Sequence, residues 1–89
     1  MIIESTHYTL KFPNRHTQII VHNASDRKKI NQFLTEAQVN FKNLSENEFS
    51  ISLTAPKLLA QIRKNVTTSD AFTTMLHADL KTCAAISGF

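Results

Sequence analysis

The sequence predicts an α+β fold in which a three-stranded, mainly antiparallel sheet carries its helices on one face. Residues 6–12, 17–22 and 48–54 alternate apolar and polar side chains, as half-buried strands do. Three other segments repeat apolar residues at the three- and four-residue spacing of amphipathic helices. The expected order of elements is β-β-α-β-α-α, and residues 1–89 are expected to form one small domain.

The first two strands are predicted to form a hairpin around the turn-like residues 13–16, Pro-Asn-Arg-His. Its register follows from matching apolar side chains across the two strands, since a slip by one residue would mix the two faces. The favoured register pairs Phe12 with Thr17, Leu10 with Ile19, and Tyr8 with Val21.

Three helices follow from capping residues and apolar spacing. Asn23 is a good N-cap for the first helix, although Ser25 could cap it instead, and the apolar stripe of this helix extends to Phe41. Thr54 is placed to cap the second helix, which has a proline in its first turn. The third helix is expected to run to about Ser87, with Gly88 as its C-terminal cap.

The strand order follows from the connections. The first helix links the strands at 17–22 and 48–54, so we expect these two to run parallel and the third strand to pair with the first. The spatial order would then be 2-1-3, with the second and third strands as edges. Neither segment contains proline, glycine or lysine, so both edges are predicted to be open to pairing with another chain.

Composition excludes several classes of site. The chain has one glycine, Gly88, so glycine-rich phosphate loops and nucleophile elbows are excluded. A single cysteine, Cys83, excludes intramolecular disulfides and thiolate-rich zinc sites. No cofactor and no metal site are predicted.

The cellular compartment is predicted from two features that the sequence does not show, a secretion signal and a transmembrane segment. No basic region followed by a long apolar run opens the chain, and no stretch approaches the roughly 18 apolar residues of a transmembrane helix. We therefore expect a cytoplasmic protein with no membrane partner.

The charge balance permits an acidic partner. Ten Lys and Arg against seven Asp and Glu give a net charge of +3 at pH 7. Arg27, Lys28 and Lys29 occupy the first turn of the first helix, where cations oppose the helix dipole, and Arg15 lies in the hairpin loop. These four residues are the candidate phosphate- or acidic-partner-binding set; the alternative is a solvated run of surface charge.

The outer face of the sheet supplies the second candidate site. The hairpin register sets His7 opposite His22, on the face away from Tyr8, and the same face carries Lys11 and Ile20. Two facing histidines can serve as acid and base or can simply be solvated strand residues. His7, Lys11, Ile20 and His22 are therefore predicted to form an exposed sheet face.

These features favour a small non-catalytic binding module, a regulator or inhibitor that acts through an edge strand or the exposed sheet face. The expected partner is another protein or a second copy of the chain, because so small a core leaves little room for a substrate pocket. The alternatives are a nucleic-acid-binding protein, or a metal-independent ribonuclease toxin that uses the cross-strand histidine pair.

Overall fold

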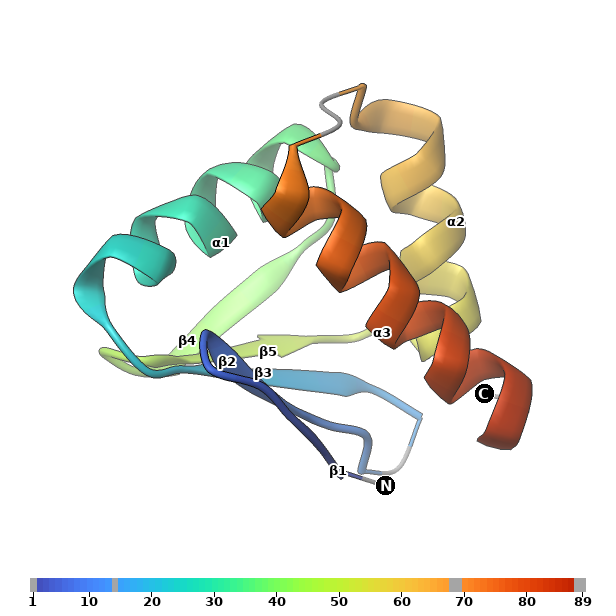
Figure 1. Ribbon diagram of the computed structural model, residues 1–89, viewed down its shortest axis with the longest axis horizontal. Helices are drawn as coiled ribbons and strands as arrows, with labels where there is room; N and C mark the ends of the chain where they lie inside the picture. The colour runs from blue at the N-terminus through green and yellow to red at the C-terminus, as the bar shows by residue number, and fades with distance from the viewer. Residues whose placement is uncertain (1, 14, 68–69, 88–89) are drawn as a thin grey trace.

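Five strands form one antiparallel sheet, and three helices pack on a single face of it, in the residues that the structure describes, 2–13, 15–67 and 70–87 (Figure 1). The structure is a computed structural model. It confirms the α+β class and the placement of the helices on one side. In chain order the elements are β1 (Ile2–Glu4), β2 (Tyr8–Lys11), β3 (Thr17–Val21), α1 (Ala24–Glu36), β4 (Phe41–Ser45), β5 (Glu48–Ile51), α2 (Ala55–Asn65) and α3 (Ala71–Ser87).

The predicted hairpin is present in the predicted register. Tyr8 pairs with Val21 and Leu10 with Ile19, so apolar side chains of β2 and β3 meet on the helix-covered face. The turn between the strands is closed by the His16 N–H, which donates to the Pro13 carbonyl at 3.1 Å. This register confirms that apolar matching decides how the two strands pair.

The predicted number of strands is wrong: the sheet has five, in the order β1-β2-β3-β5-β4, instead of three in the order 2-1-3. β1 and β4 were not expected. α1 ends at Glu36, because Gln38 adopts a left-handed conformation (φ 59°) that stops the helix. Phe41 therefore begins a strand and does not extend the helical stripe.

The edges of the sheet are also corrected. β5 lies between β3 and β4 and is antiparallel to both, so β3 and β4 run in the same direction. The parallel connection expected after the first helix therefore leads to β4, the strand that was missed. The strands predicted as edges, β3 and β5, are internal, and the edges are β1 and β4.

Both actual edges carry features that discourage pairing with another chain. β1 is only three residues long. β4 contains Lys42, and its register shifts at a bulge between Asn43 and Ser45. Short length, lysine and bulges are the usual protections of an edge strand. The edges of this sheet therefore differ from the expected ones and carry protections that the expected edges lacked.

The core lies between the sheet and the helix layer. The caps agree with the sequence at two helices: the Asp26 N–H donates to Asn23 Oδ1 at 2.9 Å, and Thr54 is the N-cap of α2. The predicted cap Gly88 lies outside the described residues. The largest fully buried side chains come from strands and all three helices: Tyr8, Leu10, Ile19, Val21, Ile30, Leu34, Phe49, Ile51, Leu58, Ile62, Leu76 and Leu80.

Candidate binding surface

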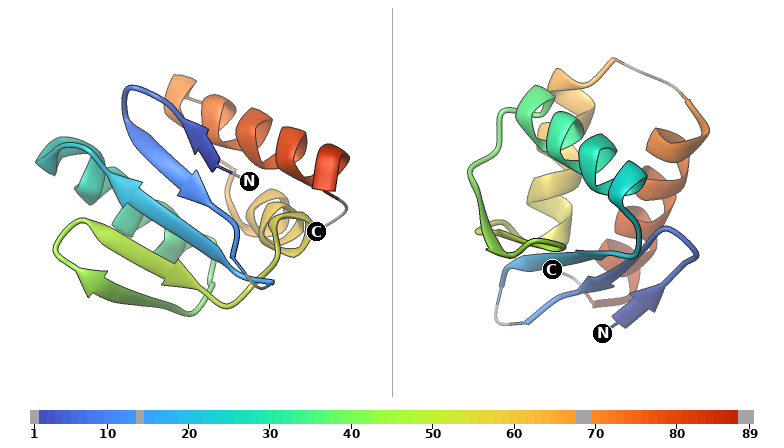
Figure 2. Two further views of the ribbon diagram at one scale, coloured as in Figure 1. Left: turned by 90° about the horizontal axis from the view of Figure 1, so that it is seen from below. Right: turned by 90° about the vertical axis from the view of Figure 1, so that its left-hand side faces the viewer.

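One face of the sheet is left uncovered by the helices, and we call it the open face (Figure 2, left). Along β2, β3 and β5 its side chains alternate with buried ones, and on all five strands they are half-buried or exposed. Strand pairing aligns them in rows across the sheet, for example Lys11, Gln18, Ser50 and Lys42. The open face consists of Ile2, Glu4, Thr9, Lys11, Gln18, Ile20, Lys42, Glu48 and Ser50.

The charges on the open face are separated along the strands. Lys11 and Lys42 share one row, on the side where β2 ends and β4 begins. Glu4 and Glu48 lie in the next outward-facing row toward the other end, on either side of Ile20. The face therefore presents a basic end and an acidic end with an isoleucine between its glutamates.

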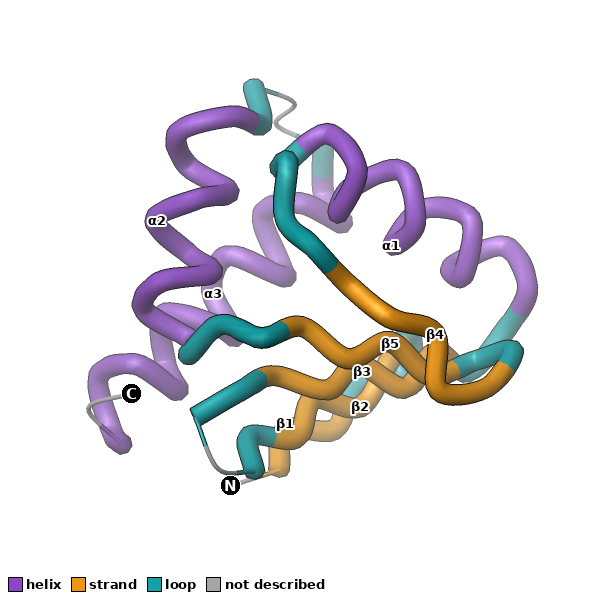
Figure 3. The backbone as a smooth tube through the Cα atoms, turned by 180° about the vertical axis from the view of Figure 1, so that it is seen from behind, coloured by secondary structure: helices purple, strands orange, loops and turns teal. Residues whose placement is uncertain are grey.

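A groove lies at the basic end of the open face, and we call it the β4 groove. Its volume is about 570 Å³. Arg15 contributes from the β2–β3 turn, and β4 and β5 form the rest; Figure 3 shows this side of the molecule with β4 nearest the viewer. The lining includes Arg15, Phe41, Lys42, Leu44, Ser50 and Ser52.

The four basic residues predicted as one binding set do not come together. Arg15 precedes β3, whereas the three basic residues of α1, at positions 27–29, follow β3. The two groups therefore lie at opposite ends of a strand about 17 Å long. Arg27 Nη1 donates to Glu46 Oε1 at 2.7 Å, and Lys29 Nζ lies 5.5 Å from the centre of the Phe72 ring. Lys28 is exposed. Only Arg15 of this set lines the β4 groove.

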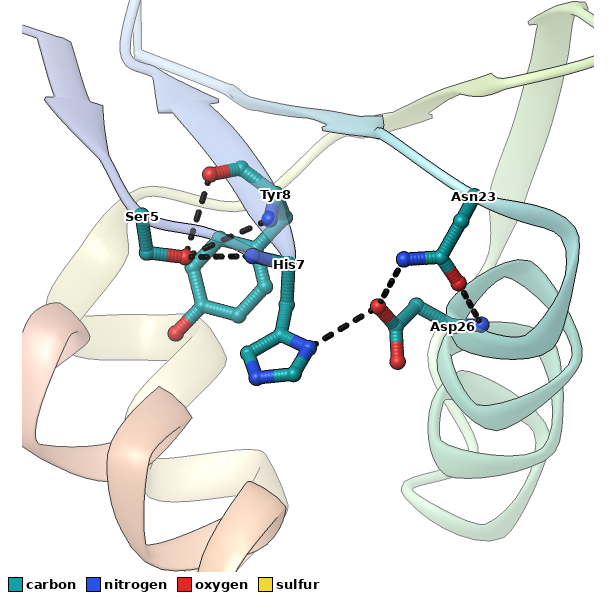
Figure 4. A network of polar contacts seen from close by, with 5 residues as sticks. All are labelled: Ser5, His7, Tyr8, Asn23 and Asp26. Carbon is teal, nitrogen blue, oxygen red and sulfur yellow. Dashed lines mark hydrogen bonds and ion pairs between the residues drawn. The ribbon is translucent and has the colours of Figure 1, made fainter.

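The predicted histidine pair is separated by the structure. The backbones do pair, because the His22 N–H donates to the His7 carbonyl at 3.2 Å. The His7 ring, however, points to the helix layer, where its Nδ1 donates to Asp26 Oδ2 at 2.9 Å (Figure 4). His22 stays on the outer side, hydrogen bonded through Nε2 to Thr9 Oγ1 at 2.9 Å. The expectation that His7 belongs to the exposed face is therefore wrong, whereas Lys11, Ile20 and His22 lie where predicted.

The reason is local: His7 lies in the bend between β1 and β2, before the regular alternation of β2 begins at Tyr8. Ser5 Oγ organises this bend by accepting the His7 and Tyr8 N–H groups at 3.3 and 3.2 Å (Figure 4). The ring then meets Phe72 of α3 edge-on, with centroids 5.9 Å apart. A bend, unlike a strand, does not fix which face a side chain takes.

Asp26 joins this bend to the start of α1. Its carboxylate is almost fully buried, at 4% side-chain exposure, against 43% for His7. It accepts hydrogen bonds from His7 and from Asn23 Nδ2, the latter at 2.6 Å. Burial alone would raise the pKa of Asp26, but these two hydrogen bonds, together with electrostatic attraction to His7 and Lys29, hold the pKa below its usual value. The ionised carboxylate thus fixes the His7 ring with its proton on Nδ1.

A further histidine lies inside the helix layer. His77 Nε2 is buried and has no hydrogen-bond partner within the described part of the chain. Its ring meets Phe33 of α1 edge-on at 6.5 Å between centroids. Burial lowers the pKa of His77, and the positive charge of Arg63 on α2 lowers it further. His77 therefore favours the neutral form in the folded protein.

Sequence reasoning missed the residues that β4 brings to the groove, Lys42 and Leu44. Residues 41–45 contain apolar side chains only at positions 41 and 44, so they show no alternation that predicts a strand. The signal that could have found β4 is indirect, since a strand must follow the crossover helix and precede β5.

Comparison with known proteins adds no relative, since no protein family, curated sequence or solved structure matches this chain. Across the described residues, no helix is both long and apolar enough to cross a bilayer. Nor do three His, Cys, Asp or Glu side chains gather there in a way that could hold a metal ion. The uncovered surface of the sheet is the feature of this molecule that bears on its function.

Proposed function

We propose that this chain is a non-catalytic binding module that docks a partner protein on the open face of its sheet. The observation that carries the proposal is the one-sided architecture: all three helices of the described chain cover one face, and the other face has no covering layer. That face combines an isoleucine, Ile20, with polar side chains and a groove. Such a surface is a common place for a partner to bind.

The composition of the open face favours a separate protein over a permanent homodimer. Its apolar side chains are few: Ile20 near the centre, and the exposed Ile2 on the edge strand β1. Interfaces of permanent homodimers are more apolar than this, whereas non-obligate interfaces resemble ordinary protein surface. A partner that binds and dissociates suits this face better than a second copy.

The same face is less suited to nucleic acid. Glu4 and Glu48 would repel phosphates over half of it. Single strands are bound on aromatic rings that stack successive bases. The described lining of the β4 groove contains the rings of Phe41 and His16, and Phe41 is already packed against Phe49 with centroids 5.7 Å apart. A protein surface is the better match for such a mixture of charges.

The test is co-purification from the organism that encodes the chain, comparing two variants. Ile20→Glu places a charge on the open face, while Ala60→Glu places the same charge on an exposed position of α2, on the helix side. A protein that is recovered with the unaltered chain and with Ala60→Glu, and is lost with Ile20→Glu, supports the proposal.

Circular dichroism verifies that both variants fold, and Gln18→Arg on the same face replaces Ile20→Glu if that variant unfolds. Equal recovery with open-face and helix-side variants overturns the proposal. So does a homodimer in sedimentation that the open-face variants dissociate, or recovery of nucleic acid in place of protein.

A further inference from the structure

We infer that the β4 groove receives an extended, acidic segment of the partner, with two carboxylates that flank an apolar side chain. This inference rests on the proposed function and specifies where on the open face the partner is recognised. It starts from the two cations of the groove, Arg15 on the β2–β3 turn and Lys42 on β4.

Neither cation has an acidic neighbour among the described residues. Within the described part of the chain, ion pairs form at His7–Asp26 and Arg27–Glu46, and no carboxylate lies within 4.0 Å of Arg15 or Lys42. Uncommitted cations on two walls of one groove attract an anionic ligand and raise its rate of association. The charge that suits this groove is negative.

The spacing of the cations indicates an extended peptide. Arg15 lies two positions before β3, and Lys42 lies in the row of Gln18, two strands away. The two cations are therefore about 10 Å apart across the strands and up to about 10 Å apart along them, roughly 10–14 Å in all. Residues four apart in an extended peptide lie on the same face and are separated by about 13 Å. One carboxylate can therefore meet Arg15 while the other meets Lys42.

The groove also offers apolar contact between its charged walls. Leu44 is 54% exposed, although it is a large apolar residue, and it lines the groove together with Phe41. Because Phe41 packs against Phe49 in the core, this wall is held in place before binding. An apolar side chain between the two carboxylates would cover Leu44, and Ser50 and Ser52 offer hydroxyl groups to the peptide backbone.

The backbone conformation of Arg15 allows its charge to be removed by a substitution that preserves the fold. Its φ of 66° lies in the left-handed region, where glycine is favoured and a residue with a side chain is disfavoured. Arg15→Gly therefore removes the cation without harming the fold. Gln38, with φ 59°, is the matched control, because Gln38→Gly makes the same backbone change outside the groove lining.

The experiment measures binding of a fluorescein-labelled peptide, Gly-Ser-Asp-Ser-Leu-Ser-Asp-Gly, whose two Asp and Leu share one face, by fluorescence anisotropy at low salt. We expect Arg15→Gly and Lys42→Ser each to weaken binding about threefold, and the double variant about tenfold, as befits exposed ion pairs. Gln38→Gly should bind like the unaltered chain. A peptide with Asn in place of both Asp should lose most of its affinity, and added salt should weaken binding.

Absence of measurable binding to the acidic peptide overturns the inference, as does equal binding by Arg15→Gly and Gln38→Gly. Tighter binding of a uridine octamer than of the peptide, lost in the same variants, overturns the peptide assignment. The proposed function fails separately: if Ile20→Glu loses the native partner while Arg15→Gly and Lys42→Ser retain it, the open face is the docking surface and the groove is not.

Discussion

Replacing Asp26 by alanine should destabilise the fold more than its position in the first turn of α1 would suggest. The carboxylate accepts charge-assisted hydrogen bonds from His7 at 2.9 Å and from Asn23 at 2.6 Å, and it is only 4% exposed. Each such bond is worth about 1.5–3 kcal/mol. His7 and Asn23 can turn to water after the substitution, because both are partly exposed, so part of this energy is recovered.

We therefore expect Asp26→Ala to lower the free energy of unfolding by about 2–3 kcal/mol, a large share of the roughly 5–15 kcal/mol typical of small domains. Urea unfolding followed by circular dichroism measures this difference. The exposed neighbour Ser25 provides the control, since Ser25→Ala in the same helical turn should change stability by less than about 0.5 kcal/mol.

A double-mutant cycle isolates the contact between His7 and Asp26. The double variant should lose less unfolding free energy than the sum of the losses in His7→Ala and Asp26→Ala, and the difference, the coupling energy, should be about 1–2 kcal/mol. Additive effects, or an Asp26→Ala variant within about 0.5 kcal/mol of the unaltered chain, would show that the network does not hold the β1–β2 bend to α1.

The contribution of Asp26 should also depend on pH. The pKa of its carboxyl is lower in the folded than in the unfolded chain, so the stabilisation is present above the unfolded value of about 3.9 and is lost as the pH falls through the folded pKa. The stability difference between the unaltered chain and Asp26→Ala should thus be full at pH 6 and shrink below about pH 4. A difference that stays constant down to pH 2 would contradict this assignment.

Two further predictions concern the helices. Gln38→Gly should raise the free energy of unfolding by about 0.5–1 kcal/mol in the same urea assay, because glycine takes the left-handed conformation at the end of α1 without steric cost; a loss of stability would contradict this reasoning. Because the pKa of His77 is lowered by burial and by Arg63, stability should fall as the pH drops below about 6.5 toward the folded pKa. His77→Leu should reduce this fall in thermal melts between pH 5 and 7.5, and parallel curves for the two chains would refute it.

Much of the helix-facing half of the molecule could be predicted from the sequence, since it depends on local patterns. Apolar alternation gives the register of β2 and β3, with Leu10 opposite Ile19, because shifting it by one residue exposes the core face. Asn23 caps α1 as expected, because its side chain reaches an N–H only three residues away. Such interactions act within a few residues and need no knowledge of distant segments.

The candidate site was predicted less completely. Lys11 and Ile20 follow from strand parity and lie on the open face as expected, and His22 lies beside that face, hydrogen bonded to Thr9. His7 could not be placed, because it stands in a bend whose direction is decided by a buried carboxylate nineteen residues away. Lys42 could not be found at all, because β4 exists through its pairing with β5 and has little apolar pattern of its own.

The sequence by itself determined the α+β class, the central hairpin, the helical stripes and the polar outer face, because periodicity and capping are written in neighbouring residues. Only the tertiary structure decided the number of strands, their order and the identity of the edges. β3 and β5 pair although they are far apart in the sequence, and this pairing depends on how α1 crosses the sheet and on the pairing of β5 with β4. As a result, the two strands expected at the edges lie in the interior of the sheet, and Arg15 and Lys42 line one groove.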